Sequence, residues 1–247
     1  MKNKTVIITG ASTGIGKAIA AYFIKKGSNV VMNSHNEENL KTAYVELGSP
    51  SNAIYYAGDI GQKSTSKALV RLAIEHFNSV DVLINNAGVF APKPFLEVEE
   101  EDLERFWGIN LKGTYFASQA AIAEMVKQQN GAIINIGTVL VDHAIGGFPA
   151  TAPITSKGAI HSLTRQLAAE FGKDNIKVNT IAPGIIRSPL QGKMGIEDAD
   201  NLAGLHLLNR IGEAEEIAEA AYYLASSDFI TGETINVAGG HTVGHAI

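Results

Sequence analysis

The chain has 247 residues, of which 45% are hydrophobic and 18% are charged, and its formal net charge at pH 7 is −5. This length and composition allow one sizeable core, so we expect a single domain over residues 1–247. The acidic balance argues against nucleic acid as a partner, because binding along a phosphate backbone needs a clustered excess of Lys and Arg. The absence of cysteine excludes a disulfide framework and a thiolate zinc site, and we expect no metal.

The opening stretch "MKNKTVIIT" joins a basic start to an apolar run that is too short for a signal sequence. No apolar run approaches the ~18 residues that a membrane span requires. We therefore expect no membrane partner and a cytoplasmic location, and we interpret residues 5–9 as the first strand.

Short β-branched runs alternate with longer helical patterns along the whole chain. The predicted helices lie near residues 14–26, 37–47, 62–77, 99–128, 155–171 and 213–226, and the predicted strands near 5–9, 29–33, 53–58, 81–85, 132–137, 177–182 and 234–238. The strand runs are continuously apolar, as expected for strands buried on both faces. The pattern predicts an α/β fold, a doubly wound Rossmann-type domain with a parallel sheet of about seven strands covered by helices on both faces.

A glycine-rich stretch, "TGASTGIG", directly follows the first predicted strand and leads into the first helix. Glycines permit a tight turn and a close approach of the backbone, and the start of the helix offers free N–H groups to a pyrophosphate. The spacing GxxxGxG is a weak signal by itself, because the same turn can join a strand to a helix without any ligand. Other motifs, "GDI" at 58–60 and "NNAG" at 85–88, end the third and fourth strands, at the edge where open α/β sheets bind ligands.

These motifs, together with "IN" at 109–110, "SK" at 156–157 and "APG" at 182–184, resemble the short-chain dehydrogenase/reductase family over essentially the whole chain. The resemblance implies a nicotinamide dinucleotide bound along this edge. The pyrophosphate is expected over the glycine-rich loop, the adenine at the third strand, the riboses at the fourth, and the nicotinamide end at the sixth. The residues that this assigns to the cofactor are Gly10, Ser12, Thr13, Gly14, Ile15, Gly16, Asp59, Ile60, Asn86, Ala87, Gly88, Lys157, Pro183, Gly184, Ile186 and Ser188.

The end of the second predicted strand should decide which dinucleotide is used. An acid there accepts hydrogen bonds from the ribose 2′-OH and repels a 2′-phosphate. Here Asn33, Ser34 and His35 occupy the corner, and their donors favour NADP over NAD. NAD stays open, because no Arg is present and Glu37 or Glu38 could reach back; Asn36 capping the next helix explains the same residues equally well.

The resemblance also implies a catalytic Tyr that gives a proton to the substrate carbonyl, a Lys four residues later that binds the ribose, an upstream Ser and a helical Asn. Lys157 and Asn110 match the Lys and Asn positions, but the position of the Tyr holds Pro153. Proline has no ionisable group and cannot serve as the acid. Thr138 stands at the position of the Ser and keeps its hydroxyl.

Another side chain would have to replace the Tyr as general acid. His143 is chemically the best of the nearby groups, since imidazole titrates near neutrality, although an isolated loop histidine is more often structural. Thr155 and Ser156 are expected at the start of the helix, where their hydroxyls cap free N–H groups. Lys157 would then lie near the helix start, where the dipole disfavours a cation.

Residues 187–210 are expected to form a substrate lid, and His206 is expected to be structural. The C-terminal tail resembles the contact region of the family, which implies a homotetramer or homodimer. Two functions stay open: an NAD(P)-dependent oxidoreductase acting on an alcohol/carbonyl pair without the Tyr, or a catalytically weak or inactive NAD(P)-binding protein acting as partner subunit or sensor.

Overall fold

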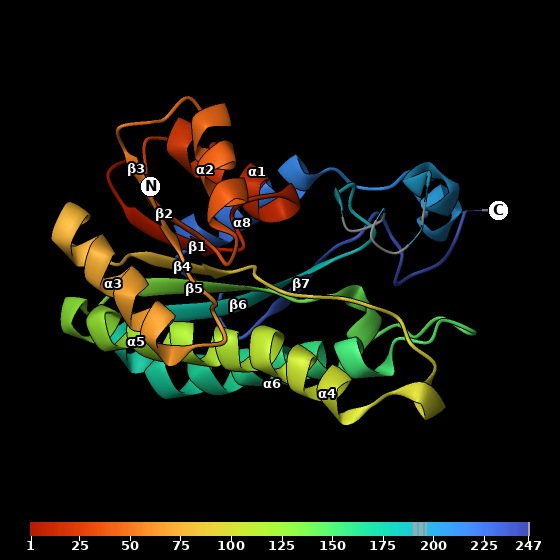
Figure 1. The fold of residues 1–247 in the computed structure, drawn as a ribbon. Helices are drawn as coiled ribbons and strands as arrows, with labels where there is room; N and C mark the ends of the chain where they lie inside the picture. The colour runs from red at the N-terminus through yellow and green to blue at the C-terminus, as the bar shows by residue number, and fades with distance from the viewer. Residues whose placement is uncertain (190–191, 193–194, 196, 247) are drawn as a thin grey trace.

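Seven parallel strands form one sheet at the centre of the molecule, in the order β3-β2-β1-β4-β5-β6-β7 (Figure 1). The computed structural model describes residues 1–189, 192, 195 and 197–246. The strand order reverses between β1 and β4, so the loops that follow these two strands open a crevice at the carboxyl edge of the sheet. The doubly wound fold predicted from the sequence is confirmed.

Each of the seven predicted strands is present, and most bounds agree within a residue or two. The strands are β1 Thr5–Thr9, β2 Asn29–Ser34, β3 Ala53–Ala57, β4 Val82–Asn85, β5 Gly131–Ile136, β6 Ile176–Pro183 and β7 Thr234–Val237. Every residue of β1, β4, β5 and β6 is buried. This burial on both faces explains why these strands read as continuous apolar runs in the sequence.

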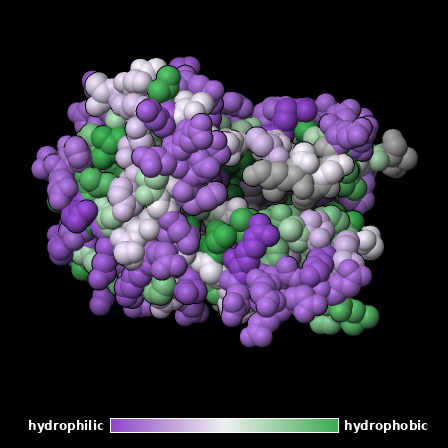
Figure 2. All heavy atoms as spheres, in the orientation of Figure 1, coloured by the Kyte–Doolittle hydropathy of each residue, from purple (hydrophilic) through white to green (hydrophobic). Residues whose placement is uncertain are grey.

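Helices cover both faces of the sheet in two layers (Figure 1). One layer holds α1 Gly14–Lys25, α2 Glu37–Glu46 and α8 Ala214–Ser226, and the other holds α3 Lys63–Phe77, α5 Gly113–Gln128 and α6 Thr151–Phe171. Phe23 and Leu40 belong to the core of the first layer, and Leu69 and Met125 belong to that of the second. The two main clusters of buried apolar side chains lie in these layers, and the face drawn in Figure 2 is mostly hydrophilic.

The single helix predicted over 99–128 is wrong in one respect, because a π-helical stretch interrupts it. The structure has α4 Glu100–Phe106, then a π-helix, η2 Trp107–Lys112, and then α5. Thr114 Oγ1 donates a hydrogen bond of 2.7 Å to the carbonyl oxygen of Asn110. A wider turn of this kind is typical of functional sites, and hydrophobic periodicity alone does not reveal it.

Helix α6 begins at Thr151, earlier than the predicted residue 155. Pro153 is the third residue of the helix, where the missing N–H costs no intrahelical bond. The expected capping role of Thr155 and Ser156 is wrong: both hydroxyls donate backward, to the carbonyl oxygens of Thr151 and Pro153, at 2.7 Å each. Lys157 therefore lies in the second turn, beyond the part of the helix where the dipole acts most strongly.

The expected lid region at 187–210 is partly described. Its central part contains a 3-10 helix, η5 Ala199–Leu205. Arg187 pairs with Asp200 at 2.6 Å and with Glu213 at 3.1 Å, which ties the beginning of this region to the segment before α8. Leu190, Gln191, Lys193, Met194 and Ile196 lie outside the described residues. Shorter 3-10 turns occur at η1 Phe95–Glu97, η3 Val139–Val141 and η4 Gly172–Asp174.

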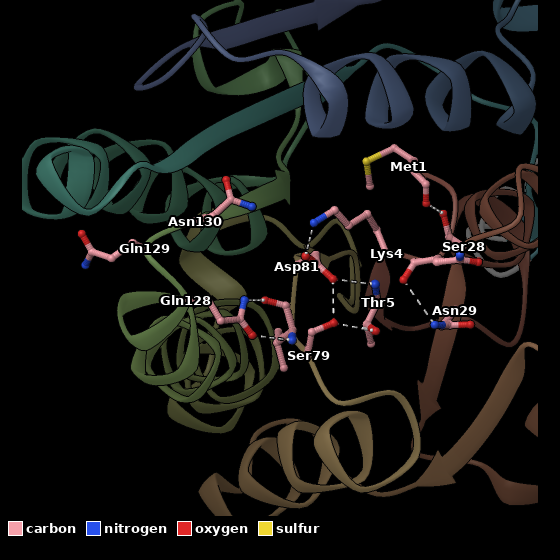
Figure 3. Close-up of polar contacts among 12 residues, drawn as sticks. Met1, Lys4, Thr5, Ser28, Asn29, Ser79, Asp81, Gln128, Gln129 and Asn130 are labelled. Carbon is pink, nitrogen blue, oxygen red and sulfur yellow. Dashed lines mark hydrogen bonds and ion pairs between the residues drawn. The ribbon is translucent and has the colours of Figure 1, made fainter.

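The opposite edge of the sheet is fixed by a buried carboxylate, Asp81, just before β4 (Figure 3). It accepts hydrogen bonds from Lys4 Nζ at 2.8 Å, from the backbone N–H of Thr5 at 2.9 Å and from Ser79 Oγ at 2.7 Å. Burial by itself would raise the pKa of Asp81, but these donors and the charge of Lys4 outweigh it and lower the pKa below its ordinary value. Asp81 therefore joins the starts of β1 and β4.

We expect Asp81→Asn to lower the free energy of unfolding at pH 7 by about 2 kcal/mol, because the amide leaves charge-assisted hydrogen bonds unmade. The folded pKa is depressed, so this stabilisation is present above the unfolded pKa of about 4 and is lost as the pH falls through the folded value. Urea unfolding at pH 7.5 and pH 3.5 measures both effects. Asp228→Asn, at an exposed carboxylate 3.8 Å from Lys177, is the matched control. Equal urea midpoints for Asp81→Asn and the wild type at pH 7.5 would contradict this role.

Candidate functional site

The loop between β1 and α1 is shaped by three glycines that cannot carry a side chain. Gly10 and Gly14 have positive φ angles, of 66° and 52°. A β-carbon on Gly16 would lie 2.2 Å from the carbonyl oxygen of Gly10, and one on Gly10 would lie 2.8 Å from Ala87 Cα. The loop is thus pressed against the chain that follows β4, as the close approach expected of a pyrophosphate loop requires.

The side chain of Asn86 holds this loop to the end of β4. Its amide donates to the carbonyl oxygens of Thr9 at 3.0 Å and Gly10 at 3.1 Å. In return, Thr9 Oγ1 accepts hydrogen bonds from the backbone N–H groups of Asn86 at 3.1 Å and Ala87 at 3.0 Å. The amide of Asn86 is therefore engaged within the protein, and its role is to shape the crevice.

Helix α1 begins at the open side of the loop. Its N-cap residue, Thr13, is exposed, and its side chain makes no capping hydrogen bond. The free N–H groups of Gly14 and Ile15 and the dipole of a 12-residue helix make this end suited to an anion. A β-carbon on Gly14 would lie 3.3 Å from Ser188 Cβ, so the segment after β6 folds back over the start of α1.

At the end of β2, the three residues expected to select the dinucleotide differ in their availability. The amide of Asn33 is buried and donates to the carbonyl oxygens of Tyr56 and Gly58, at 3.1 Å each, so the expectation that it serves as a phosphate donor is wrong. Ser34 Oγ accepts from Ser12 Oγ at 3.0 Å, which links this corner to the glycine-rich loop. His35 is exposed.

The expected adenine side of the crevice lies at the end of β3. Asp59 is exposed and accepts a hydrogen bond from the backbone N–H of Gly61 at 2.9 Å. The side chain of Ile60 is buried against α5: a β-carbon on Gly113 would lie 2.8 Å from Ile60 Cγ2. Asp59 is thus an exposed carboxylate directly after β3, while Ile60 is mainly a core residue.

Lys157, Asn110 and Gly88 come together at the centre of the carboxyl edge. A β-carbon on Gly88 would lie 3.2 Å from both Lys157 Nζ and Asn110 Oδ1. Lys157 Nζ donates to the carbonyl oxygen of Ile136 at 2.6 Å, and burial lowers its pKa to about 8. Asn110 Oδ1 accepts from the N–H of Val89 at 2.8 Å, and its amide donates to the carbonyl of Val89 at 3.1 Å and to Ser156 Oγ at 2.9 Å. These bonds hold Asn110 and α6 against the segment after β4.

The chain that follows β5 carries Thr138 and His143. Thr138 caps the short η3 turn, where its hydroxyl accepts from the N–H of Leu140 at 3.3 Å. His143 is half-buried, and its ring packs against those of His241 at 5.3 Å and His245 at 5.8 Å between centroids. Pro153 lies at the buried start of α6, four residues before Lys157 and on the same face.

The segment after β6 forms the last wall of this edge. Pro183 is buried at the end of β6, Gly184 fits only because it lacks a side chain, and Ile186 is buried and bridges to Gly212. A β-carbon on Gly184 would lie 2.9 Å from His206 Nε2. His206 is buried, and its Nε2 accepts the backbone N–H of Ile185 at 3.1 Å, in agreement with its expected structural role.

Sequence reasoning missed the tail histidines His241 and His245, which the fold brings to His143. Their position in the last residues of the chain gave no signal of this proximity. It also missed His161, a buried ring on α6 whose Nδ1 lies 4.0 Å from Asp142 Oδ2. Among the described residues, no group of three or more His, Asp or Glu side chains is arranged to hold a metal ion.

Comparison with known proteins places the whole chain in one family. Residues 10–242 match the family model described as "Enoyl-(Acyl carrier protein) reductase". The chain is 32% identical over 244 residues to the 3-oxoacyl-[acyl-carrier-protein] reductase FabG of Thermotoga maritima, which covers 97% of this chain and 98% of the relative. It is 36% identical over 250 residues to the L-rhamnose-1-dehydrogenase of Scheffersomyces stipitis, and this match spans 97% of this chain and 96% of the relative.

A solved structure described as "ElxO with NADP Bound" superposes with a TM-score of 0.90 at 31% identity, covering 98% of this chain and 99% of that one. Across the described residues, no helix is long and apolar enough to cross a membrane. The match over nearly the full length, the sheet order and the glycine-rich crevice agree with one another. The chain belongs to the short-chain dehydrogenase/reductase family, a family of NAD(P)-dependent oxidoreductases.

Proposed function

We propose that this protein interconverts a small-molecule carbonyl compound and its alcohol with NADP(H), using a proton donor other than tyrosine. The observation that carries the proposal is the arrangement at the carboxyl edge: Lys157 Nζ and Asn110 Oδ1 face Gly88, beside a glycine loop with no room for side chains. A protein that no longer bound a nucleotide would gain nothing from a loop without side chains or from a half-buried ammonium group beside it.

The nucleotide, when bound, supplies the hydride. Lys157 is suited to hold the ribose hydroxyls, because its ammonium has donors left beyond the one given to Ile136. Thr138 offers a hydroxyl to the substrate oxygen, and His143 is the group that gives or takes the proton. Gly184, Ile186 and Ser188 would hold the nicotinamide end, and Asp59 the adenine.

NADP is the favoured dinucleotide. No acid stands at the end of β2, where Ser34 and the exposed His35 offer donors to a 2′-phosphate. The superposed ElxO structure carries NADP in its description, which supports the same choice. NAD is the alternative, and Glu37 and Glu38 in the first turn of α2 are the acids that could favour it.

A second function is favoured by Pro153 alone: an NADP(H)-binding partner subunit or sensor with weak or no turnover. A positioned acid contributes ~10²–10⁴-fold to a rate, so its loss without replacement would leave slow chemistry. The two functions share the nucleotide site and differ only in whether a side chain replaces the missing phenol.

We also propose that the protein is a homo-oligomer. Large apolar side chains are exposed on α4, on the π-helix, between η5 and α8 and near the C-terminus, namely Leu103, Trp107, Leu208 and Val243. Such side chains support burial against further copies of the chain.

Ser34→Asp is expected to reverse the nucleotide preference. A carboxylate at the end of β2 repels a 2′-phosphate and accepts from a 2′-OH, so the Kd for NADPH should rise at least ~10-fold while that for NADH falls. Fluorescence titration with both nucleotides measures the two values. Ser51→Asp, an exposed change in the loop before β3, should leave the ratio of the two unchanged. An unchanged ratio in Ser34→Asp would refute the assignment of this corner.

His143→Gln is expected to lower kcat by ~10²-fold on any carbonyl substrate that the wild type turns over, with little change in nucleotide Kd. The matched control is His76→Gln, at an exposed histidine remote from the site. Wild-type kcat in His143→Gln would exclude this side chain as donor.

Pro153→Tyr is expected to raise kcat and to make turnover far less sensitive to His143→Gln in the double variant, because the phenol would share a helix face with Lys157. Thr151→Tyr, an exposed change in the same turn, is the control and should do neither. A panel of ketones, sugars and acyl β-keto compounds covers the substrate classes. Tight nucleotide binding without turnover in the wild type across this panel would favour the second function.

Nucleotide binding is expected to weaken above pH 8, where Lys157 loses its charge. The apparent Kd rises as the protonated fraction falls, by up to about 10-fold for each pH unit above 8. Lys157→Met should bind more weakly at pH 7 and show a flat pH dependence, whereas the exposed Lys173→Met should behave as the wild type. Calorimetric titration from pH 7 to 9.5 tests this; a wild-type Kd that does not change with pH would rule out the ammonium as a nucleotide contact.

A further inference from the structure

Four histidines from three separate parts of the chain meet at the carboxyl edge of the sheet. His241 is the central ring: its centroid lies 5.3 Å from that of His143, 5.1 Å from that of His206 and 5.9 Å from that of His245. The contacts with His143 and His206 are edge-to-face, with interplanar angles of 82° and 88°. We call these four residues the histidine cluster.

The cluster connects the loops that follow β5, β6 and β7. His143 follows β5, His206 lies in the region between β6 and α8, and the other two belong to the tail after β7. In Figure 1 these segments, from green to blue, gather at the same end of the molecule. The loop after β5, which carries the proposed proton donor His143, is therefore packed against the C-terminal tail of the same chain.

Both ends of the cluster are anchored to backbone groups. His206 Nε2 accepts the N–H of Ile185, so the proton of its neutral ring is on Nδ1. His245 Nδ1 donates to the carbonyl of Leu205 at 3.0 Å, and the N–H of Ala246 donates to the carbonyl of Gly204 at 3.0 Å. The tail is thus fixed to the segment that leads into α8, next to the Gly184 turn proposed to hold the nicotinamide end.

His241 itself is almost completely buried, and neither of its ring nitrogens has a hydrogen-bond partner. Burial, and then the neighbouring His206, His143 and His245, lower its pKa to about 4, so the ring is neutral at pH 7. Leaving a buried donor and acceptor unpaired costs about 1–3 kcal/mol each, and such groups call for an explanation. This buried ring packs edge-to-face against that of His143.

We propose that the C-terminal tail is part of the active site, and that His241 and His245 are positioning residues that hold His143 toward the substrate oxygen. The proposal deepens the proposed function and rests on His143 as proton donor. His241 packs edge-to-face against His143 on one side and against His206 on the other, and His206 is anchored to the Ile185 N–H. His245, which is exposed, makes the second ring contact with His143. Donor and hydride source are therefore positioned by the same turn after β6.

The proton step balances with solvent as the final source or acceptor of the proton. In the reducing direction the carbonyl carbon receives a hydride, its oxygen takes the proton from the imidazolium of His143, and the ring is left neutral. Water then returns a proton to His143 from the side of the exposed His245. In the oxidising direction neutral His143 removes the hydroxyl proton, and the same steps run backward.

Several charged or titratable groups surround His143. Asp142 precedes it and lies 4.0 Å from His161 of α6. The positive charges of Lys157 and Arg165 also act on His161. From the tail come His241 and His245, and from the segment before α8 comes His206, near the charge of Arg210. His245 is the exposed member of the cluster in direct contact with His143, so it is the position at which a charge can be introduced with least disturbance.

The test places opposite charges at His245 and follows His143 by NMR in the full-length protein. With His245→Gln as the neutral baseline, His245→Glu should raise the pH midpoint of the His143 Cε1–H resonance by about half a pH unit, and His245→Lys should lower it by a similar amount, as expected for a charge about 6 Å away at low salt. In the dependence of kcat/KM on pH, the limb that disappears in His143→Gln should shift in the same direction as this NMR midpoint. Val243→Glu and Val243→Lys, at an exposed tail position outside the cluster, should move neither.

A second pair of variants separates packing from folding. His241→Ala should lower kcat by ~10-fold with no change in nucleotide KM, whereas His241→Phe, which restores an aromatic edge without nitrogens, should recover most of the loss. Identical NMR midpoints in the Glu, Gln and Lys variants at 245, or equal losses of kcat in the two His241 variants, would overturn the tail proposal while leaving His143 as donor. Full turnover in His143→Gln would instead overturn the proposed donor itself, and the positioning role with it.

Discussion

The contact between the loops after β1 and β4 is the constraint on which the rest of the site depends. Four hydrogen bonds cross it, from Asn86 and Ala87 on one side to Thr9 and Gly10 on the other. The missing side chains of Gly10 and Gly16 let the two backbones touch. This contact opens the crevice at the point where the strand order reverses, and it turns the start of α1 outward toward an anion. Lys157 and Asn110 then approach Gly88 from the opposite wall. The glycine-rich loop, Asn110 and Lys157 together form the part of the site proposed to bind the nucleotide.

The chemical half of the site is built differently. One helical turn before Lys157, the chain has a proline that the first turn of α6 accommodates without losing a hydrogen bond. The loop after β5 and the C-terminal tail meet nearby through the histidine cluster. A general acid on a loop must be held by its neighbours, since a loop position by itself is less precise than one on a helix. Packing against anchored rings is a physical means of holding it.

Strand positions could be predicted because buried parallel strands are continuous apolar runs, and the glycine motifs located the crevice. Four features could not be predicted this way. The π-helix at Asn110 has the same apolar periodicity as an α-helix, and α6 starts earlier than its capping residues suggested because Pro153 is compatible with a first turn. Asn33 carries donors that suit a phosphate, yet the fold buries them in hydrogen bonds to carbonyl oxygens at the end of β3. The histidine cluster joins residues about a hundred positions apart, so only the folded chain brings it together.

The proposed function assigns the proton transfer to the imidazole of His143 rather than to a phenol. The most direct measurement is a crystal structure of the ternary complex with NADP⁺ and a slow alcohol or ketone ligand. A donor role for His143 requires one of its nitrogens within about 2.6–3.2 Å of the ligand oxygen, with Thr138 Oγ1 as the second contact of that oxygen. A ligand oxygen that meets only Thr138 and water, with the His143 ring turned away, would contradict it.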